Sequence, residues 1–467
     1  MTKRSLAWWA IVWSVSVLPL SAGELSRPGQ VESAAAAIPG TPAERGFHWL
    51  TTKPYLPADF DNATLESLWQ NWSSPRREQA EKATPAERRR LTFEYYGLMP
   101  RPGSTTAGAP LGYVDDGRNG FVMNCLSCHT GKVAGEVVLG VGNSQFALQT
   151  LTEDVRWTKI RMGKPLSHLD LASLKMPLGT SHGTTNSVIF GVALGSIRDK
   201  DLNLVLNRPE PQLLHHDMDA PPLWNVRKKK MLYSDGFVAK GHRPLLQFVM
   251  LPRNSGKQLK AWEPDFRDIL AWIESLPVPK YRGEIDRPLA DRGKVAFEAH
   301  CARCHGTYGT NGTYPNKVVS IDEVQTDPLR LKSLTTEYRK SMQDGWFGDY
   351  GAKPYNLDPQ GYLAPPLDGI WASAPYLHNG SVPTLWHVLH PDSRPAVWKR
   401  TVDGYDRARG GLEVEEFSAV PPTAKSPAEK RSYFDTRLPG KSAAGHRFPD
   451  ELSEEQKRAV LEYLKTL

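Results

Sequence analysis

The 467-residue chain has only four cysteines, no long block of like charge and only one long apolar run, and each of these features excludes some classes of protein. The apolar run, Leu6 to Leu20, is short for a hydrocarbon core about 30 Å thick, so no stable membrane span is predicted. The longest basic run is Lys228-Lys229-Lys230, and acidic residues are interleaved elsewhere. The formal charge of +7 therefore does not indicate a partner nucleic acid.

The N-terminus has the pattern of a secretion signal. Lys3 and Arg4 form a positive start, the apolar run follows, and Ser21-Ala22-Gly23 supplies small residues for cleavage. No cysteine lies near this point, which argues against a lipoprotein. We therefore expect residues 1–23 to be a signal peptide and the mature protein to be periplasmic or secreted.

All four cysteines fall in two copies of the pattern C-x-x-C-H, Cys125 to His129 and Cys301 to His305. This is the attachment signature of c-type haem, in which each thiol bonds one vinyl group and the histidine reaches the iron from the proximal side. The alternatives are a pair of disulfides or a cysteine-rich zinc site, but two copies of the signature that use every cysteine of an exported chain disfavour both. A thioredoxin-like motif is also disfavoured, because it would not require a histidine after both pairs. The sequence therefore predicts two covalently bound haem c groups. Their attachment residues are Cys125, Cys128, Cys301 and Cys304, and their proximal iron ligands are His129 and His305.

A short internal repeat relates the two halves of the chain. Ala220-Pro221-Pro222-Leu223 recurs 144 positions later as Ala364-Pro365-Pro366-Leu367, and Asp235-Gly236 corresponds in the same way to Asn379-Gly380. We interpret this repeat as the trace of a duplication that left one haem-binding unit in each half.

Helical patterns close both halves. One covers residues 265–276 and stops at a proline, and the other covers 453–467, where Ser453 and Gln456 have the spacing of a capping box. Further helices are predicted over 85–96, capped by Thr84, and over 291–300. With 38 glycines and 38 prolines, the remainder is expected to be largely loop. The predicted fold class is mainly α.

The expected organisation is two cytochrome c-like haem domains preceded by an extension. An N-terminal extension over 24–110, rich in Trp and Tyr, has no apparent counterpart in the second half and is expected to pack on the first haem domain. The first haem domain is assigned to 111–280 and the second to 281–467. The proline-rich segment after residue 276 is the predicted linker between them.

The sixth ligand of the second haem is left open by spacing alone. His446, in a loop before the closing helix, competes with His378, and Met342 is a weaker candidate. A solvent-exposed loop is the alternative interpretation for His446.

The corresponding positions in the first half suggest an open first haem. Aligning the closing helices places Ser255 opposite His446, and the ungapped repeat places Ser234 opposite His378. Neither serine is a good iron ligand. His242, Met250 and Met231 lie close enough in sequence to alter this conclusion.

Two aromatic residues are candidates for a role beside the haems. Phe237 is interpreted as a shield over an open first haem. Trp224 directly follows the first Ala-Pro-Pro-Leu segment and is interpreted as an electron relay between the haems. An ordinary core position is an equally good interpretation of Trp224.

The arrangement resembles the di-haem cytochrome c peroxidase and MauG-like superfamily, and within it the rubber-oxygenase-like, or RoxA-like, branch. Besides the C-x-x-C-H motifs, the likeness is carried by Asn124-Cys125-Leu126-Ser127-Cys128-His129-Thr130-Gly131-Lys132-Val133-Ala134-Gly135, Tyr362-Leu363-Ala364-Pro365-Pro366-Leu367-Asp368-Gly369-Ile370-Trp371, Tyr376-Leu377-His378-Asn379-Gly380-Ser381-Val382-Pro383-Thr384-Leu385 and Gly445-His446-Arg447-Phe448.

The resemblance implies that the two haems have different functions. In the RoxA-like branch the second haem is held by two histidines, here His305 and His446, and dioxygen binds at the first haem, here held by His129. That branch oxidatively cleaves or oxygenates an unsaturated organic substrate, whereas the peroxidases reduce hydrogen peroxide with electrons from a small donor cytochrome. The chain lacks an evident methionine ligand typical of the peroxidases, and it is shorter than the rubber-cleaving enzymes.

Two functions follow. The first is an exported di-haem oxidoreductase whose first haem activates peroxide or dioxygen while the second relays or stores electrons. Its expected partners are a small redox protein or small-molecule electron donor, and peroxide, dioxygen or an organic substrate. The second is a non-enzymatic electron-transfer cytochrome, which the basic net charge suits, although dedicated carriers are commonly much smaller.

Overall fold

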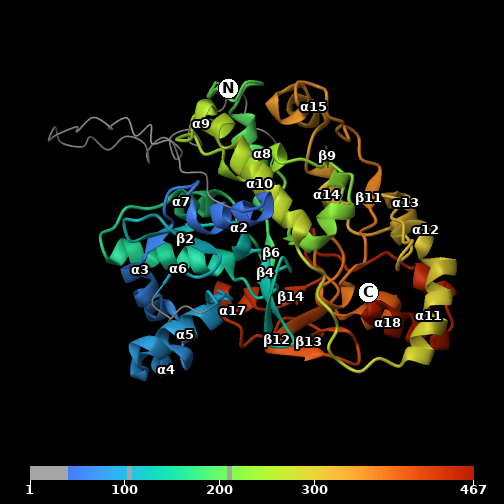
Figure 1. Ribbon diagram of the computed structural model, residues 1–467. Helices are drawn as coiled ribbons and strands as arrows, with labels where there is room; N and C mark the ends of the chain where they lie inside the picture. Colours follow the sequence, from blue (N-terminus) through green and yellow to red (C-terminus); the bar gives the residue numbers. More distant parts are fainter. Residues whose placement is uncertain (1–39, 103–107, 208–212) are drawn as a thin grey trace.

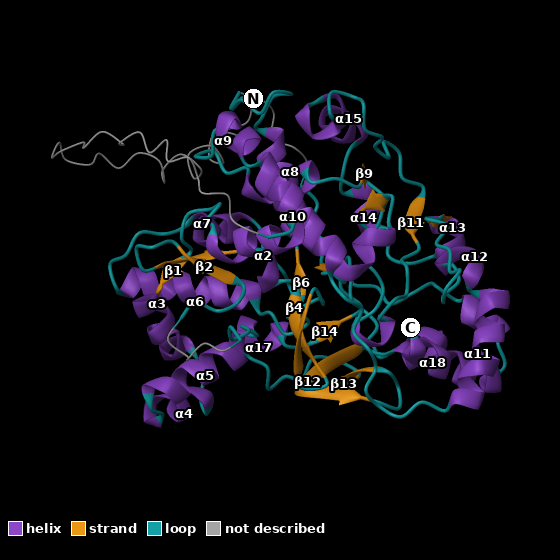
Figure 2. Ribbon diagram, in the orientation of Figure 1, coloured by secondary structure: helices purple, strands orange, loops and turns teal. Residues whose placement is uncertain are grey.

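The computed structural model describes residues 40–102, 108–207 and 213–467, so the expected signal peptide lies outside the described residues (Figure 1). In these ranges no helix combines the length and apolar character needed to cross a membrane. The structure is 43% helical and 13% strand, and its strands form several small sheets (Figure 2). The fold is therefore mixed α/β. The expectation of a mainly α fold built from two cytochrome c-like domains is wrong.

Helices of very different length surround the small sheets. Three of the 3₁₀-helices are η2 (Cys125–Ser127), η3 (Leu223–Lys228) and η4 (Arg243–Val249). The α-helices are α2 (Pro42–Thr52), α3 (Asn62–Ser67), α4 (Arg76–Lys82), α5 (Pro85–Tyr96), α6 (Leu148–Arg161), α7 (His168–Lys175), α8 (Ser187–Ser196), α9 (Gly256–Ala261), α10 (Glu263–Ser275), α11 (Arg287–His300), α12 (Ala302–His305), α13 (Ile321–Val324), α14 (Leu329–Lys332), α15 (Thr336–Asp344), α16 (Leu385–Leu389), α17 (Pro427–Arg431) and α18 (Glu454–Thr466).

Within the described residues, the strands pair antiparallel in six sheets, with orders β1-β3-β2, β4-β5, β6-β7, β8-β9, β10-β11 and β13-β12-β14. They are β1 (Phe60–Asp61), β2 (Tyr113–Asp115), β3 (Gly120–Met123), β4 (Thr130–Val133), β5 (Glu136–Leu139), β6 (Thr184–Thr185), β7 (Met218–Asp219), β8 (Met231–Leu232), β9 (Val238–Ala239), β10 (Val318–Ser320), β11 (Gly361–Leu363), β12 (Val397–Asp406), β13 (Gly411–Phe417) and β14 (Phe434–Asp435).

A hairpin replaces the expected loop directly after the first C-x-x-C-H motif. Strands β4 and β5 pair from Thr130 with Leu139 to Val133 with Glu136. Ala134 and Gly135 form the two-residue turn, with φ of 50° and 86°. Positive φ at both turn residues matches the right-handed twist of the strands, and the valines on either side favour extended backbone. This local β structure is one reason why the helical prediction fails.

The β12-β13 hairpin crosses from the second half of the chain onto the first. Asp403 accepts hydrogen bonds from Lys132 at 3.0 Å and from Gln145 at 3.2 Å. Arg431, also from the second half, pairs with Glu153 on α6. In Figure 1, β12, β13 and α17 accordingly lie beneath β4 and α6. These contacts tie the two halves together and explain why two separate haem domains are not seen.

Two crossed helix pairs nevertheless repeat one another. Helix α2 packs on α10, and a Cβ atom added at Gly46 would lie 1.9 Å from the Asp268 carbonyl oxygen. Helix α11 packs on α18, where a Cβ at Gly293 would lie 1.9 Å from the Ala459 carbonyl oxygen. Glycine is required at both crossings because the backbones nearly touch. Helix α2 is thus a counterpart of α11, although the sequence suggested none for the N-terminal extension.

The helices predicted from sequence form where expected, with shifts at their ends. Helix α5 spans 85–96 and is capped by Thr84, and α18 is preceded by the capping box of Ser453 and Gln456. Helix α11 begins four residues earlier than predicted because the Asp286 carboxylate accepts the Leu289 N–H and caps it. Local capping chemistry therefore accounts for these boundaries.

Candidate haem-iron sites

The first C-x-x-C-H motif is held in a tight turn between β3 and β4. Asn124 caps the turn by accepting the Leu126 N–H at 2.8 Å, and the His129 N–H returns to the Cys125 carbonyl at 3.0 Å. The hairpin then closes over the motif, since Gly140 donates to the His129 carbonyl at 2.8 Å. These bonds fix two thiols and one imidazole in a single turn, as haem c attachment requires.

The His129 imidazole is partly buried, and its Nδ1 atom is fully covered. Burial lowers its pKa to about 4, which keeps it neutral and able to bind a metal ion at physiological pH. The nearby Pro221 carbonyl partly offsets this lowering of the pKa, because a carbonyl oxygen favours the protonated ring. Within the described residues Nδ1 makes no full hydrogen bond, so the carbonyl orients the ring only loosely.

The second C-x-x-C-H motif follows α11 directly and forms α12. The Cys301 N–H donates to Phe297 at 2.8 Å, and the His305 N–H donates to Cys301 at 3.1 Å, so the motif continues from the helix. His305 Nδ1 lies 2.9 Å from the Pro365 carbonyl oxygen, which assigns the proton to Nδ1 and leaves Nε2 for a metal. Pro221 and Pro365 stand at equivalent positions of the internal repeat, so the repeat supplies the carbonyl behind each proximal histidine.

His446 faces His305. The two imidazole centroids lie 6.2 Å apart, and burial lowers the pKa of His446 to about 3, with His305 adding to the effect. His446 has a φ of 48°, and its N–H donates to the Val324 carbonyl at 2.6 Å, which pins the loop. Two metal–imidazole bonds of about 2 Å, plus the distance from each ring centre to its nitrogen, account for this separation. The pair therefore fits one iron between its rings.

The competing candidates for this position lie elsewhere. His378 stacks on Tyr362 with centroids 4.2 Å apart, and its carbonyl accepts the Asp219 N–H. Met342 is buried in the core cluster that also contains Phe237 and Tyr338. Among the described residues, His446 is the histidine whose ring contacts that of His305.

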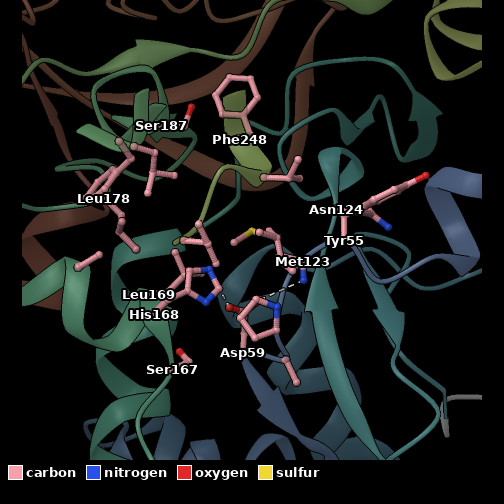
Figure 3. Close-up of a pocket in the computed structure, with 18 of the residues that line it drawn as sticks. Tyr55, Asp59, Met123, Asn124, Ser167, His168, Leu169, Leu178, Ser187 and Phe248 are labelled. Carbon is pink, nitrogen blue, oxygen red and sulfur yellow. Dashed lines mark hydrogen bonds and ion pairs between the residues drawn. The ribbon is translucent and has the colours of Figure 1, made fainter. Parts of the chain in front are cut away.

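A large, mostly apolar cavity opens beside the first motif. Its volume is about 990 Å³, at the upper end of the usual size of ligand pockets. Cys125, Cys128 and His129 form part of its wall. The rest comes from the segment between α2 and α3, from α7, α8, η4 and α10, and from adjoining loops. It includes Leu169, Leu178, Phe190, Leu245, Phe248 and Ile269. The close-up in Figure 3 shows Leu169, Leu178 and Phe248 among the labelled side chains around the open space.

One end of the cavity carries buried polar groups. Asp59 Oδ1 lies 3.8 Å from His168 Nε2, and its other oxygen accepts the Met123 N–H at 3.0 Å (Figure 3). Burial raises the pKa of Asp59 to about 7 and, together with Lys159 and Arg253, lowers the pKa of His168 to about 3. Asp59 therefore exchanges a proton near neutral pH, next to a neutral imidazole.

The sequence missed this polar end. Asp59 lies far upstream of the motif, and His168 lies well after it in a segment without a recognisable pattern. The candidates named from sequence do not line the cavity: His242 bonds Glu263 at 2.8 Å, Met250 is fully buried in the core, Met231 and Ser234 lie at and just after β8, and Ser255 caps α9.

The two predicted aromatic residues are both buried. Trp224 is fully buried, and its indole N–H donates to the Asp368 carbonyl at 2.7 Å. Its ring also lies against the backbone of Gly140, which follows the first motif, and of Gly369. Phe237 packs instead against Tyr355, with centroids 5.3 Å apart, and is not among the residues that line the cavity. Its role as a shield stays a prediction.

The residues present fit two haem c groups. All four thiols are free in the structure, and each pair precedes a partly buried, neutral histidine. Among residues 40–102, 108–207 and 213–467, no group of three or more His, Cys, Asp or Glu side chains forms a compact metal site. The donor sets therefore match an iron carried by a porphyrin rather than an ion held by protein ligands alone.

Comparisons with known proteins agree with a cytochrome. Residues 361–399 match the family described as RoxA-like, cytochrome c-like. The chain is 28% identical over 256 residues to the uncharacterized protein y4iM of Sinorhizobium fredii, covering 49% of this chain and 56% of that protein. It is 26% identical over 247 residues to the uncharacterized protein y4iJ of the same organism, covering 40% of each. The chain thus spans about half the length of these curated relatives.

The family match covers the segment that holds Pro365 and His378. It supports a c-type cytochrome with covalently bound haem, of the RoxA-like branch. The wider peroxidase and MauG-like superfamily is not confirmed by these matches and stays a prediction.

Proposed function

We propose that the protein is an exported di-haem c-type cytochrome that works as an oxidoreductase. Cys125, Cys128 and His129 hold the first haem, and Cys301, Cys304 and His305 hold the second. The RoxA-like match supports the cytochrome class. The number of haems and the enzymatic role rest on the two motifs and on the geometry around them.

The observation that carries the proposal is the difference between the two proximal histidines. His305 has His446 opposite it at 6.2 Å, whereas His129 borders a cavity of about 990 Å³. When bound, haem c supplies an iron that reacts with peroxide or dioxygen at an open axial position and carries single electrons when both positions are filled. His446 closes the second site. The cavity beside His129 would hold the first haem itself, and among the described residues no ring contacts His129 as His446 contacts His305.

The cavity wall supports an organic substrate as well as a small oxidant. Its apolar side chains, among them Phe190, Leu245 and Phe248, exclude water and favour a hydrophobic molecule. At the polar end, Asp59 holds or releases a proton near neutral pH, and the neutral His168 is its nearest partner. A small redox protein or a small molecule donates electrons to the second site.

Trp224 is the proposed link between the sites. Its ring lies between the Gly140 backbone, which bonds His129, and the Asp368-Gly369 backbone, which directly follows the repeat segment that bonds His305. Burial and the 2.7 Å hydrogen bond hold the ring in one orientation. An aromatic ring in this place is suited to pass single electrons between the two sites.

Electron paramagnetic resonance of the oxidised holoprotein tests the proposal. We expect one high-spin signal from the first site and one low-spin signal from the second. His446→Ala should abolish the low-spin signal, and the control His378→Gln should preserve it. Cyanide should bind one haem in the wild type and two in His446→Ala.

Two low-spin haems that bind neither cyanide nor peroxide would contradict an enzymatic role. That result, with rapid reversible electron exchange, would instead identify a non-enzymatic electron-transfer cytochrome.

A further inference from the structure

A cluster of buried charges beside the second motif carries more positive than negative charge. Asp235 accepts hydrogen bonds from Arg330 at 3.0 Å and from Arg339 at 2.6 Å. All three side chains are 0% exposed. In the part of the chain that the structure describes, no other carboxylate lies within hydrogen-bonding distance of either guanidinium. One buried positive charge is therefore left without a counter-ion.

The two arginines differ in how well they are satisfied. Arg339 donates to the Leu334 carbonyl at 3.4 Å and the Asn356 carbonyl at 3.0 Å, besides its bond to Asp235. Arg330 bonds only Asp235, and its Nε and Nη1 are buried without a partner among the described residues. A buried, unpaired guanidinium edge is costly, so this edge is expected to meet a ligand.

Two residues associated with this cluster, one through the chain and one through the charge of Arg330, also carry unpaired polar atoms. Ser234 Oγ, next to Asp235 in the chain, and His216 Nε2 are both buried without a partner in the described structure. His216 is 1% exposed, and burial together with the charge of Arg330 lowers its pKa to about 4. A neutral histidine and a hydroxyl beside a cation form a polar lining suited to an anion.

This cluster touches the segment that orients His305. The Leu363 N–H donates to the Ser234 carbonyl at 2.7 Å, and two residues later the Pro365 carbonyl receives His305 Nδ1. Leu331, adjacent to Arg330, packs against the small core cluster that contains Cys304. In the view of Figure 1, α14 lies on the inner side of β11, and α12 and α13 lie on the outer side.

We propose that the free edge of Arg330 binds a propionate carboxylate of the haem attached to Cys301 and Cys304. Ser234 and His216 complete the polar lining of this site. The inference rests on the proposed second haem. Thioether bonds would hold the vinyl edge of the haem at the cysteines, which leaves the propionates on the edge away from them, and α14 lies across β11 from α12 (Figure 1). The carboxylate supplies the missing negative charge, and a hydrogen bond to a charged donor is among the strong ones.

We expect this site to raise the midpoint potential of the second haem. A cation bonded to the propionate offsets its negative charge, so removing that cation favours oxidised iron and lowers the midpoint potential. We expect Arg330→Gln to weaken reduction of the second haem about tenfold, which corresponds to about 59 mV for a one-electron couple. The same variant should shift the propionate bending mode of that haem in the resonance Raman spectrum.

Arg339→Gln is the matched control. It removes the same charge from the same Asp235 network, but every hydrogen bond of Arg339 goes to protein atoms, so the propionate mode should stay at its wild-type position. Arg330→Lys should restore most of the potential, because it keeps the charge. If Arg330→Gln fails to fold, Ser234→Ala takes its place, because it removes one lining hydroxyl without changing the charge. A shifted propionate mode in Ser234→Ala would then support the inference, and an unchanged mode would contradict it.

The readouts separate failure of this inference from failure of the proposed function. Haem content is first measured per chain as the pyridine haemochrome. One haem per chain would overturn the two-haem proposal, and this inference with it. Two haems with an unchanged propionate mode in Arg330→Gln and Ser234→Ala would overturn this inference alone. A midpoint potential of the second haem that changes with chloride or acetate concentration, with an unchanged propionate bending mode, would also overturn this inference. It would identify a free anion as the ligand of Arg330.

Discussion

Trp224 donates its indole N–H to the backbone carbonyl of Asp368 at 2.7 Å, and the two residues are separated by 144 positions. That separation is also the offset of the internal repeat, so equivalent positions of the two repeat copies contact each other. The next residue, Asn225, donates to the Pro366 carbonyl at 3.0 Å. The two segments that present a carbonyl to His129 and His305 are therefore bonded directly to one another.

Replacing Trp224 with Phe should slow electron exchange between the haems several-fold. The change removes the indole hydrogen bond and leaves the Asp368 carbonyl buried and unpaired, which costs about 1–3 kcal/mol of stability. Trp371→Phe is the control, because Trp371 is also buried and bonds the Pro279 carbonyl at 3.1 Å. Both variants should lose similar stability, but only Trp224→Phe should slow the exchange measured by flash photolysis. Equal rates in the two variants would remove Trp224 from the electron path.

Replacing His378 with Gln should make the protein less sensitive to acid. Burial lowers the pKa of His378 to about 3, so the native state holds it neutral and the unfolded chain takes up a proton below pH 6.5. Stability is therefore lost as pH falls from about 6.5 to 3, by roughly 1.4 kcal/mol per pH unit for this group. Denaturant unfolding at several pH values should show a shallower acid slope in the variant. An unchanged slope would mean that His378 is charged or accessible in the native state.

Replacing Asp59 with Asn should change the pH dependence in the opposite direction. Burial raises the pKa of Asp59 to about 7, so the native state favours the protonated form. Its contribution is present below about pH 4 and is lost as pH rises toward 7, again by roughly 1.4 kcal/mol per pH unit. Asp59→Asn should remove this loss and still accept the Met123 N–H.

Asp61→Asn is the matched control for Asp59. Lys164 and Thr64 lower the pKa of Asp61 against the effect of burial, so its contribution is present at neutral pH and lost on acidification. Unfolding curves should therefore change with opposite sign in the two variants. The same sign in both would contradict the assignment of Asp59 as the buried, protonated carboxyl of the cavity.

Replacing Gly46 or Gly293 with Ala should destabilise the protein by about 1–3 kcal/mol or more, because each methyl would lie 1.9 Å from a backbone oxygen of the crossing helix. At an open helical position the same change stabilises by about 0.5–1 kcal/mol, so the sign is informative. Gly241→Ala, whose added Cβ would have no neighbour closer than 3.8 Å, is the control for thermal unfolding. A gain in stability at Gly46 would disprove the close helix crossing.

Local chemistry was readable from the sequence. The haem motifs, the capping box of Ser453 and Gln456 and the helix over 85–96 depend on residues a few positions apart, so pattern and spacing suffice to predict them. The Ala-Pro-Pro-Leu repeat is also visible in the sequence. In the structure its two copies place the Pro221 carbonyl near His129 and the Pro365 carbonyl near His305. The choice of His446 over His378 came from the family resemblance, and the ring geometry now favours it.

Long-range packing was not readable. The pairing of Asp59 with His168 and the crossing of α2 with α10 join segments far apart in the chain, and no short pattern encodes them. The strands were missed because most are two to four residues long and are stabilised by antiparallel partners rather than by their own composition. Phe237 packs against Tyr355 in the fold, and its role as a shield over the first haem stays a prediction.

The crossing of α2 and α10 also has a kinetic consequence. Arg45 and Asp268 bond at 2.8 Å although 223 positions separate them, and Tyr55 bonds Asp265 across 210 positions. Contacts this distant require the closure of very long loops, and the chain loses conformational entropy before the stabilising contacts form. Topologies of this kind therefore fold slowly. The wall that encloses His129 is thus completed late, after the chain from η2 to α10 has been laid down, and the first motif stays open to its cofactor until then.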